Sequence, residues 1–409
     1  MMRTGVVAER VAGIVAMLGP LFRFVTESRY ARRVGDPAIC DFVFGNPHDA
    51  PLEGFVAALV RWSLPQNKDW YAYKMSEPEA TSVVAAALRE RRGAPFEEED
   101  VFLTNGAFAA LSVTLAAISD PGDEVIFISP PWFFYEALIV ACGARPVRVR
   151  VTPDTFDLDL DAIAAAITEH TRAVIVNSPN NPTGRIYSPE TLGELGHLLG
   201  EASARIGHTI YLLSDEAYSR ILFDGRPYHS PTTYYPHSFL IYTYGKTLLT
   251  PGQRLGYVAL PPTMPERGQL RPALLVSQLM TGYAFPNALL QHALSDIEQL
   301  SIGVDCLELR RDRLVSALRG MGYETNVPEG TFYLLVRSPL KDDLTFSEML
   351  AGHDIFCLPG ALFEMPGYFR ISLTANDEMI EQALPGFAAV IQQAQDDEVM
   401  RRGGQPFSL

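Results

Sequence analysis

Cysteine is scarce in this chain of 409 residues, and what there is of it is widely spaced. Cys40, Cys142, Cys306 and Cys357 form no C-x-x-C pair, and the eight histidines form no H-x-x-x-H pair. These spacings argue against a disulfide framework and a zinc site, so we predict no metal. Few cysteines are typical of a protein in the reducing cytoplasm, where we expect this one.

Positive charge is also in short supply. Lys and Arg number 33 against 48 Asp and Glu, which leaves a formal charge of −15. Nucleic acids and anionic membranes favour basic partners, so we predict no nucleic-acid partner. A local cluster of Arg and Lys could still bind a small anion. With 47% hydrophobic and 20% charged residues, the composition is that of a globular protein, and the length suggests two or three domains.

The chain lacks a long uninterrupted apolar run. Residues 11–25 are mostly apolar, but Glu9 precedes them, Arg23 interrupts them and no small-residue cleavage site follows. The run is also shorter than the roughly 20 residues of a membrane-spanning helix. We therefore predict a helix of a soluble protein, lying on a partner subunit, and no membrane partner.

Three common catalytic motifs are missing. G-x-G-x-x-G, G-x-x-x-x-G-K-[ST] and G-x-S-x-G do not occur, which argues against a Rossmann dinucleotide enzyme, a P-loop NTPase and an α/β-hydrolase.

From residue 80 onward, short apolar runs alternate with helical patterns. We expect strands at 100–104, 123–129, 172–178, 209–215 and 238–245, and helices at 79–93, 106–119, 133–143 and 189–206. Such alternation predicts an α/β fold with a mostly parallel sheet covered by helices on both faces.

The pattern changes after residue 290. It predicts a long charged helix over 287–320, strands at 332–338, 354–359 and 368–374, and a helix at 377–395. We interpret this part as a smaller α+β domain, which the stretch around 36–60 joins. The predicted division is a large domain of residues 56–296, and a discontinuous small domain of residues 1–55 and 297–409 with an N-terminal arm.

Ligands of open parallel sheets bind beyond the carboxyl ends of the strands. Each polar or aromatic residue that follows a predicted strand also has a structural interpretation. Gly106 could be a turn residue instead of part of an anion-binding helix N-terminus. Asp215 could be a helix N-cap, and Asn181 a turn residue. Trp132 could belong to the core, and Lys246 and Arg254 could be surface charges.

Several segments, taken in order, resemble the class I/II aminotransferases, in the aspartate aminotransferase (fold type I) superfamily of pyridoxal-phosphate (PLP) enzymes. The resemblance implies a large domain with a mostly parallel seven-stranded sheet flanked by helices, plus the smaller α+β domain. The segments are FGNP (44–47), WYAYKMSEPEA (70–80), TNGAFAAL (104–111), DPGDEVIFISPPWFFY (120–135), NSPNNPTG (177–184), SDEAY (214–218), YTYGKTLLTPGQRLGY (242–257), PEGTFYLLV (328–336), LPGALF (358–363) and YFRISL (368–373).

The resemblance implies a role for each matching residue around pyridoxal 5'-phosphate. Lys246 would hold the cofactor aldehyde as a Schiff base and move a proton at the substrate Cα. Asp215 would keep the pyridine nitrogen protonated. Asn181 and Tyr218 would donate to the phenolic oxygen. The remaining cofactor residues would be Trp132 on the ring and Gly106, Ala107, Phe108, Thr243 and Arg254 at the phosphate.

Substrate binding is implied in the same way. Arg370 would bind the α-carboxylate, with Gly45 and Asn181 completing the site, although a strand arginine facing solvent is the alternative. Tyr71 matches the tyrosine that reaches the phosphate of a neighbouring subunit, and Tyr73 is its alternative. The resemblance thus implies a homodimer with shared active sites.

The implied function is transfer of an amino group from an L-amino acid to a 2-oxo acid by a ping-pong mechanism. A β-lyase, a decarboxylase or a PLP oxidase would use the same residues, and a non-catalytic sensor is a further alternative.

Gly245 replaces a hydroxyl residue usual in this family, so one phosphate contact is lost. No second arginine stands out for a substrate side-chain carboxylate, although Arg271 lies in the relevant region. Phe44, Phe133, Tyr283 and residues 12–30 could suit an apolar side chain, but core packing is the commoner use of such residues.

Overall fold

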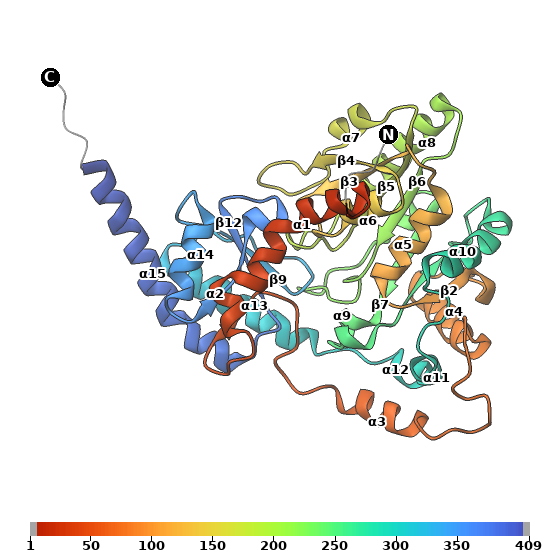
Figure 1. The fold of residues 1–409 in the computed structure, drawn as a ribbon, viewed down its shortest axis with the longest axis horizontal. Coiled ribbons are helices and arrows are strands. Elements are labelled where there is room, and N and C mark those ends of the chain that lie inside the picture. Colours follow the sequence, from red (N-terminus) through yellow and green to blue (C-terminus); the bar gives the residue numbers. More distant parts are fainter. Residues whose placement is uncertain (1–5, 404–409) are drawn as a thin grey trace.

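The computed structural model describes residues 6–403; residues 1–5 and 404–409, which belong to the predicted small domain, lie outside that part. A seven-stranded sheet forms the core of the larger part of the molecule, on the right in Figure 1. Only β8 is antiparallel to its neighbours, so the predicted mostly parallel α/β sheet is confirmed. The strand order is β2 (Val101–Thr104), β8 (Gly256–Ala259), β7 (Ser238–Thr243), β6 (Tyr211–Asp215), β5 (Thr171–Asn177), β3 (Glu124–Ser129) and β4 (Arg145–Arg150).

Helices cover both faces of this sheet because its strands are apolar on both sides. Successive residues of β3 enter different cores: Ile126 packs in the cluster of Leu195, and Phe127 in that of Leu111. One face is covered by α7 (Leu160–Ala166) and α8 (Pro189–Ile206), and the other by α5 (Ala107–Ile118), α6 (Tyr135–Ala141) and α10 (Arg267–Thr281).

A third apolar cluster lies at the β2–β8 end of the sheet. Phe55 and Ala58 of α3 pack there with Leu88, Leu290 and Leu294. The helix α3 begins three residues before the predicted start of the large domain and shares this core. The helices here are α3 (Glu53–Trp62), α4 (Pro78–Arg92), α11 (Ala288–His292) and α12 (Leu294–Ile297).

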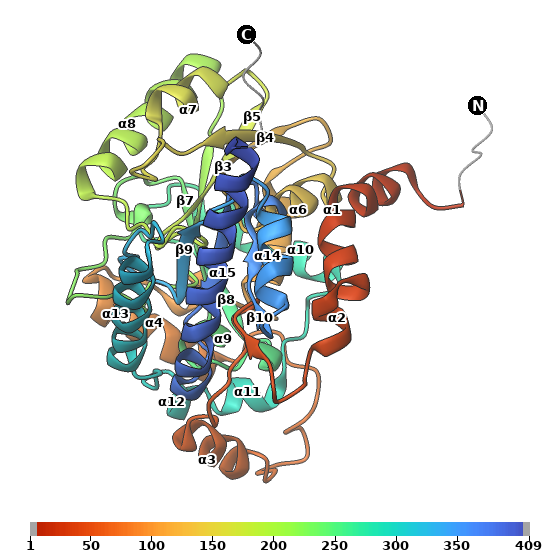
Figure 2. The ribbon, with the colours of Figure 1, turned by 90° about the vertical axis from the view of Figure 1, so that its left-hand side faces the viewer.

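The C-terminal part builds a separate small antiparallel sheet, in the order β11-β12-β9, against three helices (Figure 2). A short parallel pair, β1 with β10, joins residues 40–41 to this part. Two distant parts of the chain therefore meet here. The elements are β1 (Cys40–Asp41), β9 (Tyr333–Arg337), β10 (Ile355–Phe356), β11 (Leu358–Pro359), β12 (Tyr368–Ser372), α13 (Val304–Met321), α14 (Asp343–Ala351) and α15 (Asp377–Gly403).

The N-terminal segment forms α1 (Glu9–Glu27) and α2 (Arg29–Arg33), and α1 packs against α6. By length and composition alone, Glu9–Arg33 is the one helical stretch of the described residues that could cross a membrane. Its most apolar 18-residue window has a mean hydropathy of 1.3, and 11% of that window is buried. Leu18 and Leu21 are buried, so the C-terminal half of α1 packs against the rest of the protein.

Three predicted elements differ from the structure. The helix expected over 287–320 is divided into α11, α12 and α13, because the Ile302 N–H donates to the Thr247 carbonyl and Gly303 is extended. The strand at 238–245 ends at Thr243, whose hydroxyl accepts from the Gly245 N–H and starts α9 (Tyr244–Thr247). The strand at 354–359 is divided into β10 and β11.

Candidate active site

A cavity of about 120 Å³ lies at one edge of the large sheet. The carboxyl ends of β5, β6 and β7 meet there, together with the amino end of the antiparallel β8. The structure brings most of the predicted cofactor residues together around it. They are Ala107, Phe108, Trp132, Asn181, Asp215, Tyr218, Thr243, Lys246 and Arg254.

Asp215 ends β6 and places a buried carboxylate at this cavity. Its Oδ2 accepts from the Tyr135 hydroxyl at 2.5 Å, and its Oδ1 accepts from the Ala217 N–H at 3.2 Å. Burial raises the pKa of Asp215, while these donors and the positive charge of Lys246 oppose the rise. A cationic partner inside the cavity would therefore stabilise this carboxylate.

Lys246 projects from the single turn of α9. Its Nζ lies 5.6 Å from the centroid of the Tyr218 ring and 5.5 Å from that of Phe332. Among the residues that the structure describes, no carboxylate forms an ion pair with it. The amine is therefore available to a molecule in the cavity.

An anion-binding geometry surrounds the first turn of α5. Gly106 precedes that helix with a φ of 82°, and a Cβ there would lie 2.8 Å from Nη2 of Arg254. Glycine is needed both for this backbone angle and for the close approach of the guanidinium. Burial lowers the pKa of Arg254, whose Nη1 donates to the Pro251 carbonyl at 2.8 Å and which has no acidic partner among the side chains that the structure describes. Free helix N–H groups and a guanidinium without a carboxylate partner there together suit a phosphate.

Arg370 is buried in β12, and it lines a cavity that Lys246 also lines. Its Nη1 donates to Asn181 Oδ1 at 2.9 Å and its Nη2 to the Val43 carbonyl at 3.0 Å, while Nε has no partner. The guanidinium stacks on Tyr333, with 3.8 Å from Cζ to the ring centroid. Burial lowers the pKa of Arg370, which makes an anionic ligand favourable here.

A second cavity of about 330 Å³ adjoins the first, since Trp132, Asn181 and Lys246 line both. Gly45 and Arg370 also line this second cavity. The predicted substrate residues therefore lie together, with Asn181 between the two cavities.

Tyr71 lies away from both cavities. Its side chain is exposed, and its hydroxyl donates to the Ser63 carbonyl. Tyr73 is exposed as well and packs on Phe285. Arg271 is also distant, because it pairs with Glu97, Glu99 and Asp100. It is not positioned to bind a substrate carboxylate.

Sequence reasoning did not assign three further residues at the site. Tyr135 donates to Asp215, Tyr333 stacks on Arg370, and the Asn177 side-chain oxygen accepts from the Asn181 N–H at 2.8 Å. Tyr135 and Tyr333 lie within segments of the family resemblance, but nothing in the sequence states what they contact. Asn177 ends β5 but lies inside the strand predicted at 172–178, so the rule that ligands bind beyond strand ends does not select it; its place in the segment NSPNNPTG is the signal that could have found it.

A family model described as "Aminotransferase class I and II" matches residues 41–387. The chain belongs to this family. Its members depend on pyridoxal 5'-phosphate, so the chain is a PLP-dependent aminotransferase that moves an amino group from an L-amino acid to a 2-oxo acid by a ping-pong mechanism.

Similar proteins agree with this assignment. An aspartate/prephenate aminotransferase of Thermus thermophilus is 31% identical over 83% of this chain and 88% of its own length. An aminotransferase structure from Eubacterium rectale has a TM-score of 0.87 at 30% identity, covering 95% of this chain and 99% of that one. A Thermus thermophilus aspartate aminotransferase solved with maleate has a TM-score of 0.78 at 28% identity, covering 95% and 100%. The fold is therefore fold type I.

The donor set of this aminotransferase fits its cofactor. PLP carries a phosphate, an aldehyde and a pyridine nitrogen, and the cavity has a separate group for each. Arg254 with the α5 N-terminus suits the phosphate, Lys246 the aldehyde and Asp215 the protonated nitrogen. The cavity thus offers a cation for the phosphate, an amine for the aldehyde and a buried carboxylate for the ring nitrogen.

Proposed function

We propose that Lys246 is the residue that binds the PLP aldehyde and moves the proton of the substrate Cα. The support is its amine, which has no acidic partner among the described residues and borders both cavities. When bound, the cofactor ring accepts the electrons left at Cα as the proton departs. Asp215 holds the ring nitrogen protonated, and the Tyr135 hydroxyl keeps this carboxylate oriented.

Asn181 and Tyr218 would hold the phenolic oxygen of the ring, with Trp132 against one face. Gly106, Ala107, Phe108, Thr243 and Arg254 would hold the phosphate. Gly245, which replaces the usual hydroxyl residue, has little room for a side chain, because a Cβ there would lie 3.2 Å from Pro251 Cα. Arg254 and the helix N-terminus would therefore carry most of the phosphate binding.

Arg370 would bind the substrate α-carboxylate through Nε and the outward side of its guanidinium. Asn181 and the Val43 carbonyl fix the orientation of that side chain. A carboxylate held at Arg370 would place the substrate Cα beside Lys246, so that this amine could accept the Cα proton while the carboxylate stays bound. This geometry favours proton transfer over loss of the carboxylate, which supports transamination.

Replacement of Lys246 tests this assignment. The purified wild-type protein with PLP should show a visible absorbance band that shifts when an amino acid is added. Lys246→Ala should lose the wild-type band, leaving only the absorbance of unlinked PLP, and should show no measurable amino transfer, while Lys68→Ala, at an exposed lysine, should keep both. A Lys246→Ala variant that transfers amino groups at the wild-type rate would contradict the proposal.

We also propose a homodimer in which Tyr71 reaches the phosphate of the partner subunit, with Tyr73 as the alternative. Both tyrosines are exposed in the single chain, which leaves them free to contact a second copy. A cytoplasmic location, without a membrane or nucleic-acid partner, fits the chain best, because α1 contributes Leu21 and Val25 to the wall of the substrate cavity. Sedimentation of the purified protein and fractionation of the cells that make it test these two proposals.

A further inference from the structure

The second cavity has two chemically different ends. Arg370, Asn181 and Gly45 form a polar end next to Lys246. The remaining wall is almost entirely apolar and comes from three separate segments of the chain. Its apolar residues include Leu21, Phe22 and Val25 of α1, Phe44, and Phe133 and Phe134 after β3, and Asn46 is its one polar amide.

Aromatic rings extend this apolar wall towards the cofactor cavity. The centroids of Phe133 and Phe134 are 4.7 Å apart, and Phe134 lies 5.2 Å from Trp132. Phe108 contacts both Phe134, at 5.5 Å, and Trp132, at 5.4 Å. One aromatic surface therefore continues from the residue expected on the cofactor ring to the far end of the second cavity.

Positive charge is confined to the polar end. Of the described residues that line this cavity, only Lys246 and Arg370 are basic, and the proposed function uses both. Arg148, on the neighbouring strand β4, is engaged by Glu136 and Glu364. A substrate with a second carboxylate would have to place that charge against phenylalanine and leucine without a counter-cation from this chain, which is unfavourable.

We propose that this aminotransferase acts on amino acids and 2-oxo acids with a large apolar side chain, aliphatic or aromatic, and that α1 supplies the wall that binds it. The inference rests on the proposed function, in which Arg370 binds the α-carboxylate and Lys246 the cofactor. It separates this chain from relatives whose names specify aspartate. The substrate α-carboxylate lies at Arg370 and its side chain points along Phe44 and Phe133 to Phe22.

Equilibrium binding of unreactive carboxylates to the PLP-loaded protein tests the inference without turnover. The probes are 4-methylpentanoate and 3-phenylpropanoate, which are apolar, and succinate, which has a second carboxylate; the readout is the change in the cofactor's visible absorbance. Burial of the apolar side chain should make both apolar acids bind at least about tenfold more tightly than succinate. Tighter binding of succinate would overturn the inference and indicate a cation supplied by the partner subunit.

A charge placed on α1 gives a second, independent test. Phe22→Lys introduces a cation at the apolar end and should reverse the preference, with succinate gaining and 3-phenylpropanoate losing about tenfold each. Val15→Lys is the matched control, because Val15 is an exposed residue of the same helix outside the cavity lining. Equal effects of the two substitutions would show that α1 does not form the side-chain wall.

Failure of the proposed function and failure of the apolar substrate class would give different results. If the wild-type protein forms no visible band with PLP, the proposed function fails and this inference with it. If the band forms and responds to an amino acid, but aspartate and succinate are preferred over leucine and 3-phenylpropanoate, the aminotransferase site stands and only the apolar substrate class is wrong.

Discussion

At Asp215, burial disfavours the charged carboxylate, while neighbouring hydrogen-bond donors and a positive charge favour it. A carboxylate inside the protein is favoured only when donors or cations surround it. Tyr135 supplies a short hydrogen bond, Ala217 a backbone donor and Lys246 a positive charge, yet burial still raises the pKa of Asp215. The protonated pyridine nitrogen would complete its environment.

Loss of the Tyr135 hydroxyl should slow catalysis through Asp215. In Tyr135→Phe the carboxylate loses a charge-assisted hydrogen bond, competes more strongly for the pyridine proton and leaves the ring a poorer electron acceptor. A bond of this kind contributes roughly 1.5–3 kcal/mol, so we expect kcat to fall about ten- to hundredfold in steady-state assays, with a smaller change in KM.

Tyr187→Phe is the control for this substitution, because Tyr187 is as deeply buried and its hydroxyl has no hydrogen-bond partner. Its kcat should stay near the wild-type value. The pH dependence of the bound cofactor's absorbance should shift in Tyr135→Phe and remain unchanged in Tyr187→Phe. Equal losses of kcat in the two variants would mean that Tyr135 acts only through packing.

The raised pKa of Asp215 predicts a pH dependence of stability in the cofactor-free protein. Between the unfolded-state value of 3.8 and the raised folded-state value, the native state binds more protons than the unfolded state. The free energy of unfolding should therefore decrease as the pH rises through this window. Thermal unfolding of the wild type and Asp215→Asn, measured from pH 4 to pH 8, should show that the difference between their Tm values changes with pH in this direction. A constant difference would contradict the prediction.

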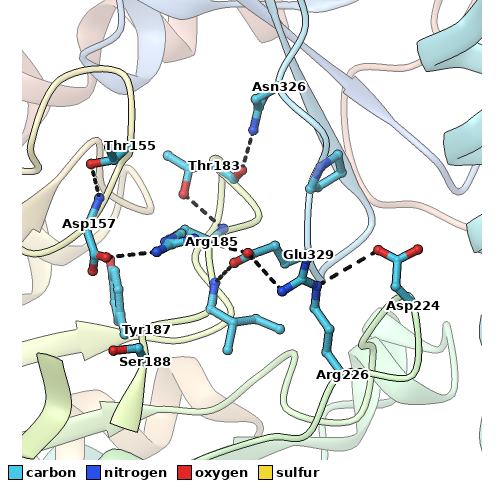
Figure 3. Close-up of polar contacts among 12 residues, drawn as sticks. Thr155, Asp157, Thr183, Arg185, Tyr187, Ser188, Asp224, Arg226, Asn326 and Glu329 are labelled. Atoms are coloured by element: carbon cyan, nitrogen blue, oxygen red, sulfur yellow. Dashed lines mark hydrogen bonds and ion pairs between the residues drawn. The ribbon is translucent and has the colours of Figure 1, made fainter. Parts of the chain in front are cut away.

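At the scale of elements, two segments from different parts of the chain hold the loop that carries Asn181. Glu329, before β9, accepts from the Ile186 N–H and pairs with Arg185 and Arg226 (Figure 3). Arg185 also pairs with Asp157, and the Asn326 side chain donates to the Thr183 carbonyl. These contacts fix the loop after β5 against the segment that leads to Tyr333 and the carboxylate site.

Glu329→Gln should weaken this connection. The glutamine loses both ion pairs, which are partly exposed, so we expect a loss of roughly 1–2 kcal/mol in the free energy of unfolding. Because Asn181 orients Arg370, the KM for the amino acid should rise several-fold, while kcat should change less. Denaturant unfolding and steady-state kinetics measure the two effects.

Glu381→Gln is the matched control, since Glu381 forms an exposed bidentate pair with Arg313 far from the loop. It should leave both the stability and KM close to wild-type values. A rise in KM of the same size in this variant would show that the effect of Glu329 is not local to the Asn181 loop.

The length and burial of each element decide how far it could be predicted from sequence. The buried strands β3, β5, β6 and β7 are largely continuous apolar runs, and the sequence predicts each of them to within two residues at either end. β8 is only four residues long and lies beside turn residues, so it was missed, although it brings Arg254 to the edge of the sheet. β4 is likewise not predicted, because Arg145, Arg148 and Arg150 interrupt its apolar residues on an edge strand.

The residues of the candidate site also differ in how far they could be predicted from the sequence. Residues at strand ends, such as Asp215, and residues in local motifs, such as Lys246, follow from the sequence. The Tyr135–Asp215 and Arg370–Asn181 contacts join residues 80 and 189 positions apart, and no local pattern encodes them. The apolar wall of the substrate cavity depends on α1, whose position on α6 comes only from tertiary packing.

At the scale of the whole molecule, the formal charge of −15 describes the surface and not the site. Lys246, Arg254 and Arg370 form a small cationic region inside an acidic protein. The surface also carries exposed apolar residues on two helices. They are Val56 and Val60 of α3, and Leu275, Val276, Leu279 and Met280 of α10. Exposed apolar residues of this extent are typical of an interface, and support a second copy there.

Mixing two defective variants tests whether the active sites are shared between subunits. In a heterodimer of Lys246→Ala and Tyr71→Phe, one site carries both defects and the other carries neither. Each variant alone should be impaired, and after subunit exchange at equal concentrations about a quarter of the wild-type activity should return, because half the dimers are mixed and each has one intact site. Lys246→Ala mixed with Asp215→Asn is the control: both defects lie in a subunit's own site, so no activity should return. Recovery with Tyr73→Phe in place of Tyr71→Phe would assign the contact to Tyr73, and the absence of recovery with either tyrosine variant would contradict a shared site.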